Sequence, residues 1–151
     1  MTREEMEKKY KLTEETKEWC GHTLHRIEAL KDFGDVKAGD KGGWIEKEEN
    51  LSHQGDAWVY DSARVYDSAW VSGSARVSDS ADYIVFKNWW SSGRYFTWTR
   101  SNNMWKVGCF YGTGEELIKK AYADSEKSGR EYERVVKYVE SILADEKENK
   151  E

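Results

Sequence analysis

Aromatic and basic side chains are the strongest candidates for chemistry in this sequence. Trp and Tyr rings stack and Arg side chains bind anions, so a cluster of both suits a protein hot spot, a nucleotide base or single-stranded nucleic acid. The cluster falls in a predicted loop and hairpin, where fewer side chains are needed for a core. The alternative is that its two adjacent tryptophans fill a junction between two parts of the fold. The members are Trp89, Trp90, Arg94, Tyr95, Arg100 and Trp105.

A second aromatic and basic set lies on a repeated segment, where we expect it to face solvent. A monomer seldom exposes so many large aromatic side chains without a use. We therefore expect self-association or partner binding on this surface. Its members are Trp58, Trp70, Tyr60, Tyr66, Arg64 and Arg76.

Groups suited to catalysis or metal binding are sparse. His53 could be the general base of a hexapeptide-type acyltransferase, but the sequence shows no partner carboxylate, so a solvated corner residue is the simpler interpretation. His22 and His25 fall on opposite faces of a predicted strand, which argues against a shared metal. Cys20 is expected in a turn, and Cys109 is expected to be buried on an apolar face. We therefore predict no catalytic residue, no metal site and no cofactor.

A six-residue repeat between Gly43 and Tyr83 positions the second set of aromatic and basic side chains. Residues two apart in a strand share a face, so the small and aliphatic positions of each repeat fill an interior and the Asp-Ser or Gly-Ser pairs turn corners. Eighteen residues then complete one rung of a triangular parallel β-helix, or β-solenoid. The repeats begin at Ala57, Ala63, Ala69, Ala75 and Ala81. The register pairs Trp58 with Arg76, Val59 with Val77 and Arg64 with Asp82.

The six-residue spacing of the repeat is interrupted upstream of Ala57, and this interruption is called the slip. Gly43-Trp44-Ile45 and Glu49-Asn50-Leu51 fit the pattern, but two extra residues near His53 separate them from the later repeats, which predicts a bulged corner. The tract amounts to about two and a third rungs, whereas solenoids generally need at least three repeats and caps. It must therefore depend on its flanking segments or on another subunit.

We predict a mixed fold of β-solenoid and α+β structure in three parts. Residues 1–42 form an N-terminal arm and a β-hairpin cap that turns at Cys20-Gly21. Residues 43–86 form the short solenoid. Residues 87–151 form an α+β module with a second hairpin, whose expected pairs are Arg100 with Trp105, Trp98 with Val107 and Phe96 with Cys109.

Two helices are expected at the C-terminus. Thr113 and Glu116 have the spacing of a capping box that begins the first helix. Apolar residues at helical spacing place the second at 129–143, followed by a charged tail that frays. The hairpin face with Phe96 and Trp98 is expected to pack against both helices, and Thr97 and Thr99 are expected to face solvent.

Composition excludes some classes of function. The 151 residues carry a net charge of −5, so there is no basic balance typical of nucleic-acid binding. No apolar run is long enough for a membrane span. The two cysteines lack metal-binding spacing, which favours a reduced, cytoplasmic setting.

Two motifs stand out, namely the 24–30 segment with the 40–51 run that leads into A-x-V-Y hexads, and the 108–116 run GCFYGTGEE. The first resembles repeat proteins of phages and prophages, most of which have no assigned function, and the second resembles the C-terminal module that often follows such repeats. The resemblance implies a phage accessory protein that acts in the bacterial host cytoplasm. With the aromatic surfaces, it predicts a non-enzymatic, anti-CRISPR-like inhibitor that binds a bacterial defence complex. Sequestration of a nucleotide signal is the second expectation and hexapeptide-type acyl transfer the third; a homodimer is expected because it would cover the solenoid ends.

Overall fold

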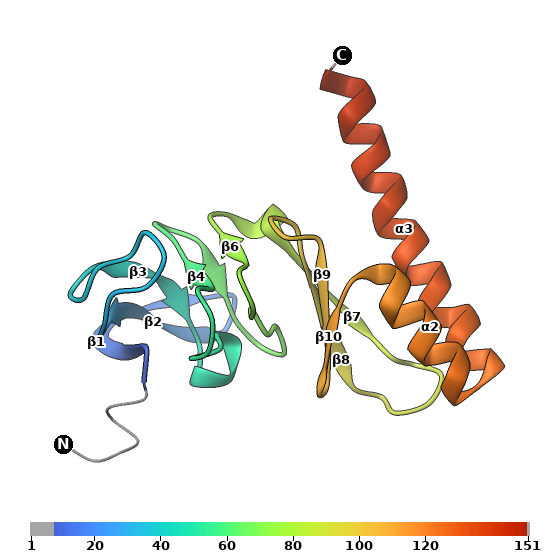
Figure 1. Cartoon of the computed structure of the whole chain (residues 1–151). Helices are drawn as coiled ribbons and strands as arrows, with labels where there is room; N and C mark the ends of the chain where they lie inside the picture. Colours follow the sequence, from blue (N-terminus) through green and yellow to red (C-terminus); the bar gives the residue numbers. More distant parts are fainter. Residues whose placement is uncertain (1–7, 151) are drawn as a thin grey trace.

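The computed structural model describes residues 8–150 and shows a mixed fold of sheets and helices without a closed barrel (Figure 1). Most of the expected N-terminal arm lies outside the described residues. Two buried clusters of apolar side chains form separate cores. The first core lies among the strands up to β6 (Arg76–Val77), and the second lies between a later sheet and two helices (Figure 1).

The N-terminal hairpin matches its prediction. β1 (Tyr10–Trp19) and β2 (His22–Ala29) pair antiparallel, and Cys20 and Gly21 turn between them with φ angles of 49° and 84°. β3 (Lys41–Ile45) continues the sheet antiparallel to β2, and β5 (Arg64–Val65) joins β3 in parallel. The hairpin is thus continuous with the first strands of the repeat.

The predicted 18-residue register is confirmed where β4 (Trp58–Val59) meets β6 (Arg76–Val77). These strands are parallel, with Trp58 opposite Arg76 and Val59 opposite Val77. Upstream, Trp44 pairs with Arg64 and Leu51 with Val71, both twenty residues apart, which is eighteen plus the predicted slip of two. The pairing of Arg64 with Asp82 is wrong, because Asp82 ends a 3₁₀ turn, η2 (Ser80–Asp82).

Small and aliphatic repeat positions fill the first core, as the period of two predicts. Ala57, Val59, Ala63, Val65, Ala69, Val71, Ala75 and Val77 are each at most 3% exposed. Lys9 enters this core from the N-terminal side, where Nζ donates to the carbonyl oxygens of Ala57 at 2.6 Å and Gly55 at 3.3 Å. Burial lowers the pKa of Lys9 to about 8. The segment before β1 therefore fixes the bulged corner.

A second, antiparallel sheet follows, in the order β10-β9-β8-β7. Its strands are β7 (Tyr83–Lys87), β8 (Tyr95–Thr99), β9 (Met104–Val107) and β10 (Phe110–Gly112). The expected β8–β9 register is wrong by two residues: Trp98 pairs with Trp105, and Thr99 with Met104. Asn103 takes a left-handed φ of 50° and accepts a 2.8 Å hydrogen bond from the Trp98 indole, so the turn closes one residue earlier than expected.

Both faces of this sheet are covered. Phe96, Trp98 and Trp105 are buried in the second core, as expected for the first two. Thr97 and Thr99 are also buried, contrary to expectation, because their face meets the repeat segment. The expected burial of Cys109 is wrong: it lies beyond β9 and is exposed.

The two helices cover the other side of the sheet. α2 (Gly114–Asp124) begins with the predicted capping box, in which the Thr113 hydroxyl accepts from the Glu116 amide and the Glu116 carboxylate accepts from the Thr113 amide. α3 (Glu126–Lys150) is longer than expected and projects past the sheet (Figure 1). The segment expected to fray is helical through Lys150. Among the described residues, no helix has the length and apolarity required to cross a membrane.

Hydrogen bonds and close packing join the repeat segment to the second sheet. The Trp70 amide donates to the Thr97 hydroxyl at 2.9 Å. The Tyr111 hydroxyl packs on Gly73, where φ is +67° and a Cβ atom would lie 1.8 Å from that oxygen. Only glycine fits this approach, and it closes one wall of a cavity between the repeat segment and the second sheet.

Candidate functional site

A cavity of about 570 Å³ lies where the slipped repeat meets the second sheet. One wall is the 3₁₀ turn η1 (Glu48–Asn50) with the bulged corner that follows it. The opposite wall comes from the next repeat and from the second sheet. The side chains that matter most are Glu48, His53, Trp70, Ser72, Lys106 and Tyr111.

His53 is held on three sides rather than solvated at a corner. Its ring stacks on Tyr10 with centroids 4.1 Å apart and an interplanar angle of 13°. Nδ1 accepts the Lys9 backbone amide at 3.1 Å, and Nε2 lies 3.4 Å from Oε2 of Glu48. No partner carboxylate for His53 was evident from the sequence, but the structure provides one five residues upstream.

These contacts determine the tautomer of His53. Because Nδ1 accepts a hydrogen bond, a neutral ring carries its proton on Nε2 and donates it to Glu48. Burial lowers the pKa of His53, although Glu48 opposes the shift, and this favours the neutral ring near pH 7. Neither nitrogen then has a lone pair available for a substrate. His53 is therefore a positioning residue, and the carboxylate of Glu48 is the group able to accept a proton.

We expect acid to destabilise the protein through His53. Its folded pKa is below the ordinary value, so the unfolded chain binds more protons and stability falls as the pH drops through about 6.5 toward the folded pKa. Protonation also removes the acceptor of the Lys9 amide. Thermal melts between about pH 7.5 and about pH 5 would measure the loss, and His53→Phe should remove this component. An unchanged pH profile in that variant would contradict the assignment.

Ser72 supplies a hydroxyl without a partner. Its side chain is 8% exposed, and its Oγ is the one buried side-chain oxygen or nitrogen in the described part of the chain that has no hydrogen bond. Leaving such a group unpaired costs about 1–3 kcal/mol. Ser72 also lines the cavity, so a ligand oxygen that reached this hydroxyl would supply the missing partner.

Trp70 and Lys106 form a surface at the same cavity. Trp70 is 40% exposed, and Lys106 Nζ lies 4.3 Å from the centre of its ring. Such a pair combines a flat apolar face with a positive charge. It can hold the extended, partly anionic part of a substrate.

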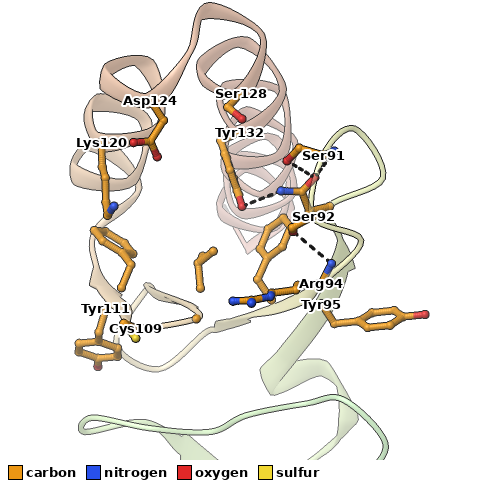
Figure 2. A pocket seen from close by; sticks show the side chains of 15 residues that line it. Ser91, Ser92, Arg94, Tyr95, Cys109, Tyr111, Lys120, Asp124, Ser128 and Tyr132 are labelled. Atoms are coloured by element: carbon orange, nitrogen blue, oxygen red, sulfur yellow. Dashed lines mark hydrogen bonds between the residues drawn. The ribbon is translucent and has the colours of Figure 1, made fainter.

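A second cavity, of about 590 Å³, opens between the helices and the ends of β8 and β9 (Figure 2). It contains two residues of the predicted aromatic and basic cluster, Arg94 and Tyr95. Trp90 packs beside it: its ring is 4.9 Å from that of Tyr132, and its indole N–H donates to Ser128. Trp89 is 65% exposed and stacks edge-on against Trp90. The adjacent tryptophans thus have different roles, Trp90 in packing and Trp89 at the surface.

The structure does not bring the rest of that cluster into one site. Trp105 is 1% exposed and belongs to the second core. Arg100 forms an ion pair with Glu146 on α3 and donates to the Ala81 carbonyl. Both therefore hold the fold together.

The expected exposed stripe on the repeat is also interrupted. Trp58 is 2% exposed, because Tyr10 and Phe33 cover it from the N-terminal segment. Arg64 stacks on Trp19 at 3.7 Å, and Arg76 lies 3.9 Å from Asp35. The aromatic side chain of this stripe that lines a cavity is Trp70.

Sequence reasoning missed Glu48, Ser72 and Lys106. Glu48 and His53 approach because the slip of two residues folds the chain back beside η1. Ser72 is one of many serines at repeat corners, and nothing local distinguishes its burial. In the described part of the chain, no group of three or more His, Cys, Asp or Glu residues is arranged to hold a metal ion.

Comparison with known proteins adds one finding on function. No family model matches the chain. Over 62 residues it is 39% identical to the protein named uncharacterized acetyltransferase YdcK of Escherichia coli (strain K12). The similarity covers 36% of this chain and 19% of that protein, so the chain matches about a fifth of the relative's length.

This similarity corrects the functional expectation. A non-enzymatic inhibitor of a bacterial defence complex was expected first, yet the relative is named as an enzyme. The expectation that this chain is not an enzyme is contradicted by the same finding. The relative's name corresponds to acyl transfer, the third of the expected functions, and to neither of the two placed ahead of it.

Proposed function

We propose that the protein transfers an acetyl group from a thioester such as acetyl-coenzyme A to an amine or hydroxyl, using the cavity beside His53. The observation that carries the proposal is the Glu48–His53 pair, which lies in a cavity with an unpaired buried hydroxyl. The similarity to a protein named as an acetyltransferase supports it.

The reaction follows from the groups present. Glu48 accepts a proton from the acceptor as its nitrogen or oxygen attacks the thioester carbon. Negative charge then develops on the carbonyl oxygen, where the Ser72 O–H donates a hydrogen bond. The carbon–sulfur bond breaks, the leaving thiolate takes up the proton that Glu48 accepted, and the acetylated acceptor is released with Glu48 again a carboxylate. The His53 Nε2–H holds the carboxylate in place throughout.

We further propose that residues 43–83 form a short β-solenoid that supports this cavity. Parallel pairs at intervals of 18 and 20 residues, with Ala and Val inside, support this architecture. The two-residue slip then has a function. It displaces one corner from the regular coil and brings His53 against η1.

The test is acceptor-dependent release of free thiol from acetyl-coenzyme A, with mixed amines, amino sugars and polyols as acceptors and mass spectrometry of the products. Ser72→Ala should lower kcat by about 10²-fold, the usual effect of removing one donor to a developing oxyanion. Its stability should not fall, because an unpaired buried hydroxyl is removed. Ser74→Ala is the matched control, since Ser74 is exposed and lies outside the cavity lining. Absence of acceptor-dependent thiol release across the panel would overturn the proposal.

A further inference from the structure

The cavity beneath the helices is a separate site rich in hydrogen-bond donors (Figure 2). Arg94 enters it from the start of β8, and Lys120 lies across from it on α2. Within residues 8–150, the side chains of Arg94 and Lys120 form no ion pair or hydrogen bond with protein groups. Two cations without protein partners therefore line one space.

Tyr132 is the buried member of the site, with 8% of its side chain exposed. Its oxygen accepts a 3.2 Å hydrogen bond from the side-chain amide of Asn88. The amide orientation is determined by Ser91, whose backbone N–H and hydroxyl both donate to Oδ1 of Asn88. The Tyr132 proton has no acceptor among the described residues, and Figure 2 shows the hydroxyl directed toward Arg94. Burial raises the pKa of Tyr132, which keeps it protonated as a donor.

Two serine hydroxyls resemble the Tyr132 hydroxyl in that the oxygen of each accepts a hydrogen bond from the protein. The Ser128 oxygen accepts from the Trp90 indole at 3.2 Å, and the Ser92 oxygen accepts from the Arg94 backbone amide at 3.2 Å. Each oxygen is thus occupied as an acceptor, and each proton remains available to a ligand. One carboxylate, that of Asp124, also lines the cavity, and it forms no ion pair with Lys120.

We infer that this cavity binds a small phosphate monoester that carries a hydrogen-bond donor on its organic part. A phosphate monoester has about −1.5 to −2 charges at pH 7 and three acceptor oxygens, which match Arg94, Lys120 and the hydroxyl donors. The organic part contacts Phe110 and Val107 in the lining, and its donor faces Asp124. A single carboxylate ligand would leave most of the donors unused. This site is independent of the proposed acetyl transfer.

Isothermal titration with phenyl phosphate tests the inference on the full chain. Saturable binding is expected with a dissociation constant of about 1 mM or tighter, and phenol should not bind. Arg94→Ala and Lys120→Ala should each weaken binding by about tenfold, because each removes charge-assisted hydrogen bonds. Tyr132→Phe should weaken it by less while keeping the ring. Asp124→Asn should strengthen the binding of phenyl phosphate, because this probe has no donor on its ring for the Asp124 carboxylate and the variant removes a charge that repels the phosphate.

Lys119→Ala is the matched control, because Lys119 is exposed on the same helix but outside the cavity lining. It should bind phenyl phosphate as the unaltered protein does. Absence of saturable binding would overturn the inference, as would equal losses for Lys119→Ala and Lys120→Ala.

The two free cysteines provide a second readout. Cys109 lines the cavity and Cys20 lies in the first hairpin turn, and both are exposed. Phenyl phosphate should slow alkylation of Cys109 by iodoacetamide and leave Cys20 unaffected. Equal protection of both thiols, or of neither, would contradict binding in this cavity.

Discussion

Trp58→Ala is expected to lower the free energy of unfolding by about 3–5 kcal/mol, the range for removing a fully buried Trp or Phe side chain. Trp58 is 2% exposed, and its ring meets Phe33 at 5.2 Å and Tyr10 at 6.2 Å. Its loss would leave a cavity between the hairpin and the repeat. Urea unfolding followed by circular dichroism measures the effect without relying on tryptophan emission.

Trp70→Ala is the matched control for Trp58→Ala. Both tryptophans hold the middle position of an Ala-Trp-Val triplet, but Trp70 is 40% exposed and stacks mainly on Lys106. Removing an exposed cation–π pair costs about 0.5–1 kcal/mol. Equal destabilisation by the two variants would show that Trp58 does not have the core role assigned to it.

Glu48→Gln is expected to lower kcat for acetyl transfer by about 10²–10⁴-fold, the usual contribution of a positioned general base. The amide keeps the shape of the carboxylate, and its oxygen still accepts the His53 Nε2–H, so the fold should be retained. The ion pair between Glu48 and Lys8 joins two side chains that are each 41% exposed, so its loss should cost about 1 kcal/mol or less.

The readouts for Glu48→Gln are steady-state thiol release and the thermal midpoint. Glu14→Gln is the control, since Glu14 is exposed and has no side-chain hydrogen bond or ion pair in the described region. Full activity in Glu48→Gln would remove Glu48 as the base. A fall in kcat with an unchanged thermal midpoint would support Glu48 as the general base.

The sequence determined the features that depend on short-range spacing. The Ala and Val positions are inside because side chains alternate along every strand. The same six-residue period gives the 18-residue register of Trp58 with Arg76, and the slip of two explains the pairing of Trp44 with Arg64. The hairpin turn at Cys20-Gly21 and the capping box at Thr113 are also local, since each depends on a few neighbouring backbone groups.

The sequence did not determine the pairing register of the second hairpin, formed by β8 and β9. Several polar residues between Thr99 and Met104 could form the turn. The choice rests on a tertiary contact, the hydrogen bond from the Trp98 indole to Asn103. The shift of two residues keeps each side chain on its expected face and moves Trp105 opposite Trp98. Cys109 is exposed because it lies in the turn between β9 and β10, where Gly108 takes a left-handed φ of 55°.

Only the tertiary structure decided which aromatic and polar groups are available for function. Trp58 and Trp70 have equivalent positions in the repeat, yet only Trp58 is covered, because Tyr10 and Phe33 arrive from a distant segment. The Glu48–His53 pair, the unpaired Ser72 hydroxyl and the donors around Arg94 likewise depend on which chain segments pack together. Burial and hydrogen bonding are properties of the whole fold, so a one-dimensional pattern indicates which faces exist but not what covers them.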